Sequence, residues 1–477
     1  MLGVDLEDDP QQLLARQRLC SLKALITPPR NIVPDVYKRV IIESEDSLSV
    51  VSVVNGAPIG KNRTGLAIAS ANVRKTPDTT ARALLFQENT AMKISNRVFL
   101  KSAFLLAWIA ILSGILIFGW TPTWKALLVP TWSPAFADMR SVQGALKSAR
   151  QGLNPQVDNP GDPWNRPLNY PAVWIWIAKL CGFDHEINYL IFVSIAVLCF
   201  IYCLYNLISE TNSIWILLIA FSGASLFAVE RGNNDIIIFS LVYLAAGAPG
   251  QLMVLLLLTA TALKIFPILV FPALIAERVS ALIFGICSTA LMFFMRTELT
   301  AIRAGTPVYY GLSYGSACIA AAAEKFFHLK IPQILISTLL IASVFVVYLK
   351  PFRFLDLHAE CTNERVKRLF CFGAYIFVGT FLLNSNWDYR LIFLLLCVPY
   401  VLLIQNQFAR IFILVCMFAA ANQMLLHFIL RSVGPMVSLL AKCILFSTLG
   451  AMILSLLKTE IESIRLFGAP AKTAQPV

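Results

Sequence analysis

The chain has 477 residues, of which 58% are hydrophobic and only 14% are charged, and its mean hydropathy is +0.71. Water-soluble domains carry a smaller apolar share and more charge, so this composition excludes them and indicates an integral membrane protein. The formal net charge of +12 does not indicate nucleic-acid binding, because many basic residues flank apolar runs and no basic stripe or binding motif is present.

The first part of the chain, residues 1–91, is polar, carries charges of both signs and shows no long periodic pattern. This composition predicts a weakly structured extension on the cytoplasmic side. A second interpretation is a mis-assigned start, because Met92 is followed by Lys93, Arg97 and Lys101 and then by an apolar run, as at a natural beginning of a membrane protein.

Twelve apolar segments follow, near 99–119, 171–183, 187–208, 213–229, 235–248, 251–276, 279–295, 331–349, 369–383, 388–404, 409–427 and 436–457. Several of them reach the roughly 17–25 residues that cross about 30 Å of hydrocarbon as a helix. They predict an all-α integral membrane fold, a polytopic helical bundle of about 10–12 transmembrane segments over residues 92–460 with a short cytoplasmic tail, 461–477.

Basic residues predict the orientation, since cytoplasmic loops collect Lys and Arg. One basic group precedes the first span, and a second lies in the loop before residue 369: Lys350, Arg353, Arg365, Lys367 and Arg368. Both groups, and with them both chain ends, are therefore predicted to be cytoplasmic. The large first loop, 121–170, is then extracytoplasmic, and a loop of this length is typically functional.

Two segments do not fit a simple span. Segment 171–183 is too short to cross and is predicted to lie along the membrane surface. Segment 251–276 is predicted to break near Lys264 and Pro267, because proline removes a backbone hydrogen bond. The alternative keeps both segments as spans. We favour the break, because it brings Lys264 to the outer side with the other polar joints, and charges within a membrane gather around functional cavities.

The first loop contains a candidate catalytic acid, Asp138. A carboxylate at the membrane boundary can act as a general base on a hydroxyl group. The alternative is structural: Asp138 would cap a surface helix running from Met139 to Arg150, since Asp is favoured at helix N-termini.

Three polar joints between apolar runs are further candidates. Residues 230–235 form either a tight solvated turn, in which Asn234 and Asp235 cap the next helix, or a site in which Arg231 binds a phosphate. Lys264 either snorkels to the interface or pairs with an anion. In 384–390, the aromatic residues fit an interfacial belt and Asp388 could pair with Arg390, although the polar density also fits a site.

No metal or cofactor is predicted. Most of the eleven cysteines lie inside apolar runs, no Cys-x-x-Cys pair occurs and only four His are present, so the cysteines are interpreted as small core residues.

The motifs, taken in chain order, resemble those of bacterial GT-C membrane glycosyltransferases, most closely the glycosyltransferase family 87 type, which includes polyprenyl-phosphate-mannose-dependent mannosyltransferases. The motifs are Phe136-Ala137-Asp138, Gly152-Leu153-Asn154-Pro155, Arg166-Pro167-Leu168-Asn169-Tyr170-Pro171, Glu230-Arg231-Gly232-Asn233-Asn234-Asp235, Leu263-Lys264-Ile265-Phe266-Pro267 and Asp388-Tyr389-Arg390. The resemblance covers about residues 99–430. Two departures occur: Ala172 stands where the family has a second proline, and residues 230–235 replace the commoner Gly-Gln-x-Asn.

The resemblance implies a GT-C fold and an inverting hexosyltransferase of the bacterial inner (plasma) membrane. Asp138 matches the family's catalytic base. The donor would be a polyprenyl-phosphate sugar, mannose-like, whose phosphate is bound by Arg231, Lys264 and Arg390, and the acceptor a lipid-linked or envelope glycan. The other motif residues are expected to bind substrate: Arg166, Asn169, Tyr170, Asn233, Asn234, Asp235, Asp388 and Tyr389. Asp138 stands alone and is not part of an Asp-x-Asp motif, which implies that no metal is needed.

Two other function classes remain open from the sequence. A lipid-linked sugar flippase or small-molecule transporter would also line a route with charges, although no internal repeat is visible. A glycan polymerase or ligase would also need a large outer loop and arginine contacts. An essential carboxylate favours the transferase, whereas essential arginines with a dispensable Asp138 favour the other two.

Overall fold

A computed structural model of the chain describes residues 37–44, 47–54, 77–306, 308, 311–349, 356–357, 359–383 and 385–468. The chain divides into two compact units, Met1–Ile94 and Ser95–Val477.

The first unit contains an antiparallel hairpin of β1 (Tyr37–Ser44) and β2 (Ser47–Val54), in which Tyr37 pairs with Val54. Their β-branched residues favour extended backbone. The predicted weak structure of 1–91 otherwise falls largely outside the described residues. Helix α2 (Pro77–Phe118) begins in this unit, well before the apolar run at 99, with proline at its first position, where a missing N–H costs nothing.

The second unit is almost entirely helical in its described part. After α2, the helices of its first half are α3 (Trp120–Ala126), α4 (Ala137–Arg150), α5 (Val173–Leu180), α6 (Glu186–Thr211), α7 (Ile214–Ala220), α8 (Gly223–Arg231), α9 (Asp235–Gly247), α10 (Gly250–Leu263), the 3₁₀ helix η1 (Phe266–Leu274), α11 (Arg278–Phe294) and α12 (Arg296–Gly305). Its second half contains β3 (Ser313–Tyr314), α13 (Ser316–Phe327), α14 (Gln333–Leu349), α15 (Glu364–Leu383), β4 (Asn386–Trp387), the 3₁₀ helix η2 (Asp388–Cys397), α16 (Val398–Val401), α17 (Gln407–Ala421), α18 (Gln423–Leu430) and α19 (Val433–Gly468).

These helices confirm a polytopic, all-α membrane protein, but with fewer full-length spans than predicted. Among the described residues, four helices are long and apolar enough to cross a membrane: Asn96–Phe118, Glu186–Thr211, Glu364–Leu383 and Val433–Glu462. The number rises to seven if each of three bent helix pairs is one span. The prediction of about 10–12 spans is therefore too high by this measure, because an apolar run does not ensure a long straight helix. Helices α9, α10 and α14 are apolar but shorter, and η1 and η2 are 3₁₀ helices.

The break predicted in segment 251–276 is confirmed. Helix α10 ends at Leu263, Lys264 is extended with φ −161° and ψ 122°, and η1 begins at Phe266. The proline at 267 lies at the start of η1, where it needs no hydrogen-bond partner. The predicted short segment 171–183 is likewise only the eight-residue helix α5.

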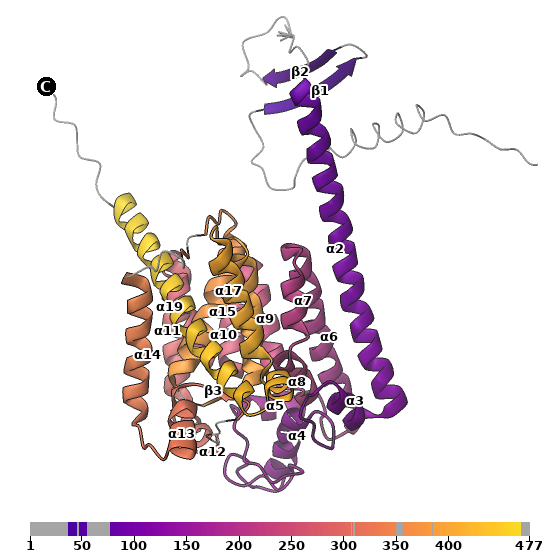
Figure 1. Ribbon diagram of the computed structural model, residues 1–477. Helices are drawn as coiled ribbons and strands as arrows, with labels where there is room; N and C mark the ends of the chain where they lie inside the picture. Colours follow the sequence, from indigo (N-terminus) through magenta and orange to yellow (C-terminus); the bar gives the residue numbers. More distant parts are fainter. Residues whose placement is uncertain are drawn as a thin grey trace, which may run out of the picture. The chain divides into compact units, whose positions relative to one another are not determined.

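The helices of the second unit run alongside one another, with α4, α5 and α12 gathered at one end (Figure 1). Ion pairs mark the opposite end, and they join α15 to three other parts of the chain: Arg365 with Glu210, Arg368 with Glu277, and Lys367 with Glu460. We call this the ion-pair end. Lys101 also lies toward this end, because it lies over the ring of Tyr205, about one and a half turns before Glu210. The candidate site therefore lies at the other end of the bundle.

Helix α4 carries the first candidate residue and is fixed by an apolar stripe. Met139, Val142, Ala145 and Leu146 are buried at the spacing of one helix face. Gly144 lets the helix approach the loop that follows it, since a Cβ at this position would lie 2.4 Å from the backbone nitrogen of Asp162. The later part of the first loop is thus packed closely against α4.

Candidate active site

The side chain of Asp138 is held by two donors from different parts of the chain. Its Oδ2 accepts a hydrogen bond from Asn233 Nδ2 at 2.6 Å, and its Oδ1 forms an ion pair with Arg166 Nη1 at 3.4 Å. Asp138 lies in the first turn of α4, where the helix dipole stabilises a negative charge, but no side chain caps this helix. The alternative role as a cap is therefore wrong, and the carboxylate is free to face a cavity.

That cavity has a volume of about 240 Å³ and opens between the first loop, α8 and the β4–η2 segment. Six of the predicted site residues line it: Asp138, Arg166, Asn169, Tyr170, Arg231 and Tyr389. The other lining residues are Trp132, Ser141, Pro167, Phe227, Gly305 and Trp387. The predicted convergence of the first loop, the 230–235 joint and the 384–390 joint is confirmed for these six residues.

Arg231 is a buried cation at the wall of this cavity. It is 5% exposed, its guanidinium lies 3.9 Å from the centre of the Trp132 ring, and its Nε and Nη1 have no hydrogen-bond partner. The nearest charge is Glu230, whose Oε2 is 3.7 Å from Arg231 Nε. Since buried N–H groups are normally paired, Arg231 has donor capacity for an anion in the cavity.

Gly232 explains how Arg231 and Asn233 reach the site together. Helix α8 ends at this glycine, which has φ +55°, and a Cβ here would meet the Cβ of Phe136 at 3.0 Å. The turn is therefore both left-handed and pressed against the residue that precedes α4, which brings Asn233 to Asp138.

Asn233 joins Asp138 to a buried ion cluster behind the cavity. Its Oδ1 accepts from the backbone of Asp235 at 2.9 Å and from Lys264 Nζ at 3.4 Å. Asp235 in turn pairs with Lys264 at 2.6 Å and with Arg390 at 3.2 Å. We call Asp235, Lys264 and Arg390 the buried triad.

The contacts of the buried triad and of Asn233 decide three predictions. Lys264 and Arg390 do not line the cavity, so the prediction that they open onto it beside Asp138 is wrong; Asn233 lies between. The pairing of Lys264 with an anion, rather than its snorkelling to the interface, is confirmed. Asn234 stands at the N-cap position of α9, as predicted, but its side chain makes no cap; the Asn233 side chain accepts from the Asp235 backbone instead.

Two other predicted residues lie away from the cavity lining. Asn234 is fully buried, and neither polar atom of its side chain has a hydrogen-bond partner. Asp388 does not pair with Arg390 as suggested but with Lys442, at 2.7 Å.

Tyr170 remains a neutral donor and acceptor in the cavity wall. Burial, and then the charge of Asp138, raise the pKa of its phenol well above the ordinary value. Its hydroxyl accepts from Asn233 Nδ2 at 3.4 Å, and Lys264 Nζ lies 5.0 Å from its ring centre. Tyr170 therefore separates the cavity from the buried triad without adding a charge.

Several contacts around the site were not predicted from the sequence. Trp132 stacks on Arg231, Asp162 orients Arg166 through a bond to its Nε at 3.1 Å, and Glu298 accepts from the backbone of Ala172 at 2.8 Å. Lys442 is a single charge within the predicted apolar segment 436–457. The rule that singled out Lys264, a lone charge within an apolar run, would have found it.

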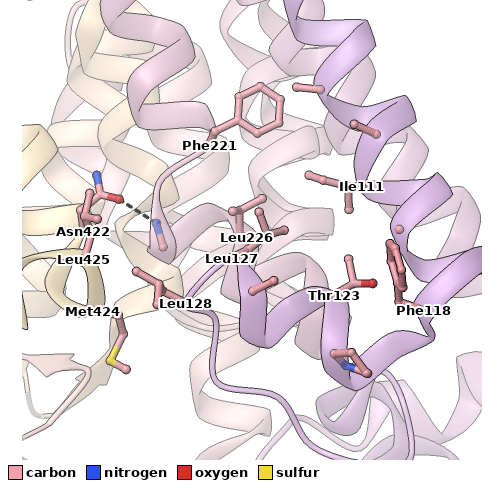
Figure 2. A pocket seen from close by; sticks show the side chains of 16 residues that line it. Ile111, Phe118, Thr123, Leu127, Leu128, Phe221, Leu226, Asn422, Met424 and Leu425 are labelled. Atoms are coloured by element: carbon pink, nitrogen blue, oxygen red, sulfur yellow. Dashed lines mark hydrogen bonds between the residues drawn. The ribbon is translucent and has the colours of Figure 1, made fainter. Parts of the chain in front are cut away.

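An apolar groove of about 710 Å³ lies beside the cavity, between α2, α3, α8 and α18 (Figure 2). Its side chains include Ile111, Phe118, Leu226, Met424 and Leu425, and Figure 2 shows the Asn422 oxygen accepting the hydrogen bond from Gly223 N. Gly223 and Met424 also line a small pocket of about 10 Å³, which shares Phe227 with the Asp138 cavity. The groove and the cavity are thus adjacent across Phe227.

Within the described residues, no group of three or more His, Cys, Asp or Glu is placed to hold a metal ion. Comparison with known proteins identifies no relative: no family model, no curated protein and no solved structure matches the chain. The class that the fold defines is a polytopic α-helical membrane protein.

Proposed function

We propose that the protein is a GT-C-type hexosyltransferase, which moves a mannose-like sugar from a polyprenyl-phosphate donor to a lipid-linked or envelope glycan acceptor at the extracytoplasmic face of a bacterial inner membrane. The observation that carries the proposal is that one cavity holds both a carboxylate, Asp138, and a buried guanidinium, Arg231, whose Nε and Nη1 have no hydrogen-bond partner. A base and a leaving-group cation are the two groups that this transfer requires.

In the proposed reaction, the acceptor hydroxyl oxygen attacks the anomeric carbon of the donor sugar. The hydroxyl proton passes to Asp138, the bond from the anomeric carbon to the phosphate oxygen breaks, and its electron pair leaves with the polyprenyl phosphate. Attack from the side opposite the phosphate inverts the anomeric configuration. Arg231 stabilises the charge that develops on the leaving phosphate, in a site where Trp132 and Phe227 exclude water.

Asn233 and Arg166 have a separate role in this mechanism. Both donate to the Asp138 carboxylate, so they fix its orientation before the acceptor enters. Lys264 and Arg390 act indirectly. Both pair with Asp235, and Lys264 also donates to Asn233, which in turn orients Asp138.

The apolar groove beside the cavity supports a donor with a long hydrocarbon chain. Its walls are almost wholly apolar and include residues of α2, the first candidate span. A chain in this groove would bring its phosphate toward Phe227 and Arg231.

The test is sugar transfer by the purified protein from a panel of radiolabelled polyprenyl-phosphate hexoses to a membrane lipid extract. The variant is Asp138→Asn, and the matched control is Asp158→Asn, which removes an exposed carboxylate of the same loop. We expect transfer by the wild type and the control, and a loss of about 10²- to 10⁴-fold in Asp138→Asn, the contribution of a general base.

Each outcome has a distinct meaning. Equal transfer by Asp138→Asn keeps the enzyme but removes Asp138 as its base. Transfer by no variant across the panel overturns the proposal and favours a flippase or transporter.

A further inference from the structure

Lys442 is a fully buried charge in the first third of α19, and it is satisfied by three acceptors. Its Nζ donates to Asp388 Oδ1 at 2.7 Å, to Gln423 Oε1 at 2.9 Å and to the Ser313 carbonyl at 3.3 Å. These are the three bonds that an ammonium group can make. A buried charge within a candidate membrane span is costly, so a functional reason is expected for keeping it.

The acceptors belong to three elements that lie close together beside the cavity, since Leu312, Asp388 and Gln423 line the small pocket that shares Phe227 with it. Ser313 is in β3, which pairs with β4, and the Asp388 backbone nitrogen donates to the Leu312 carbonyl at 2.8 Å. Gln423 begins α18, directly after the 86° bend that separates it from α17. Lys442 therefore ties β3, the start of η2 and the start of α18 to α19.

The segment that Lys442 holds carries one wall of the cavity. Trp387 precedes Asp388 and Tyr389 follows it, and both line the cavity with Asp138. The next residue, Arg390, pairs with Asp235 of the buried triad. A shift of Asp388 would thus move the cavity wall and loosen the triad together.

We propose that Lys442 and Asp388 form a positioning pair, which holds the 387–390 segment so that the cavity wall and Arg390 stay in register with Asp138. Neither residue lines the Asp138 cavity. The inference rests on the proposed function only for its effect on sugar transfer; its effect on the 387–390 segment does not depend on which reaction the protein catalyses.

The test uses the double variant Lys442→Met/Asp388→Leu. Removing one charge alone would leave the other buried and unpaired and could prevent folding, whereas replacing a buried pair with apolar side chains is often neutral for stability. The matched control, Lys367→Met/Glu460→Leu, removes an ion pair from the ion-pair end of the same helix, α19.

Two measurements are made on each purified protein: backbone hydrogen exchange by mass spectrometry, and sugar transfer over a range of pH. For Lys442→Met/Asp388→Leu we expect a slightly lower thermal midpoint than that of the wild type, because Gln423 Oε1 and the Ser313 carbonyl lose their donor. We also expect exchange at least about tenfold faster in residues 311–316 and 385–397, but not in the rest of the chain, and kcat lower by about 10- to 100-fold. The pH profile should keep its wild-type shape, because the base is unchanged. The control should match the wild type in all of these.

Wild-type exchange in the double variant would overturn the inference whatever the activity. Faster exchange with wild-type kcat would make the pair a structural element only. If the wild type itself transfers no sugar, the proposed function fails, and the exchange measurement alone decides whether the pair positions the segment.

Discussion

Replacement of Arg231 tests whether its Nε and Nη1, which have no hydrogen-bond partner, stabilise the leaving phosphate. In Arg231→Met, the Trp132 stacking and the charge are both lost, while the cavity wall keeps an unbranched side chain of similar reach. Hydrogen bonds from a charged group contribute about 1.5–3 kcal/mol each. Two such bonds, from Nε and Nη1, would stabilise the transition state. The amount is similar to the effect of removing one oxyanion-hole donor from other enzymes, about 2.7–4 kcal/mol. We therefore expect kcat to fall by about 10²- to 10³-fold.

The assay is steady-state sugar transfer with kcat and KM determined separately. If Arg231 acts mainly on the leaving group, the loss appears in kcat, because an interaction made only in the transition state does not change ground-state binding. Arg231→Lys keeps the charge but loses the planar fork, so we expect only partial recovery. Arg150→Met is the control, since Arg150 is an exposed arginine of α4 that pairs with Asp184.

The same change also removes the cation nearest to Glu230. Glu230 keeps two donors, the Trp132 backbone at 3.0 Å and Trp120 Nε1 at 3.4 Å, so the protein is expected to fold with a lower thermal midpoint. Glu230→Gln/Arg231→Met separates the two effects, because it restores charge balance without restoring the cation. Wild-type kcat in Arg231→Met would refute the role in leaving-group stabilisation.

Three further predictions concern the surroundings of Asp138. Asn233→Leu removes the donor to its Oδ2, and kcat should fall by roughly 10- to 100-fold, the value of a hydrogen bond to a charged group; an unchanged rate would mean that the carboxylate needs no orientation. Tyr170→Phe should leave the alkaline side of the pH profile of transfer unchanged, because the pKa of Tyr170 is raised well above its ordinary value and the phenol stays neutral at working pH; a shifted alkaline limb would contradict this. Gly144→Ala places a Cβ 2.4 Å from Asp162 N, so the free energy of unfolding should fall by about 1–3 kcal/mol, measured as a lower thermal midpoint; an unchanged midpoint would show that the loop yields.

Local signals predicted much of the helix pattern. Proline and the lone Lys264 were sufficient to predict the break between α10 and η1. The alternative of a helix from Met139 to Arg150 agrees with the bounds of α4, although Asp138 does not cap it. The number of long straight spans among the described residues, four to seven, differs from the predicted 10–12, because hydropathy does not distinguish a straight helix from a 3₁₀ helix or a bent pair such as α17 and α18.

Which site residues touch each other could not be predicted, since it depends on how distant segments pack. Asp138 and Asn233 are 95 residues apart, and Asp235 and Arg390 are 155 apart. Motif order therefore identified Lys264 and Arg390 as candidates, but not their position behind Asn233. The sequence also could not show that Asp388 pairs with Lys442 and Arg390 with Asp235, instead of with each other.

The amide of Asn233 has a further consequence for how the site tolerates change. Its nitrogen faces the anion Asp138 and its oxygen faces the cation Lys264, so a single uncharged group presents opposite polarity to its two neighbours. A carboxylate of the same shape at 233 would repel Asp138, and a basic side chain would repel Lys264. Because an amide does not ionise, this junction keeps the same polarity across the physiological pH range. The acid and the buried triad are thereby joined by a contact that no proton can switch.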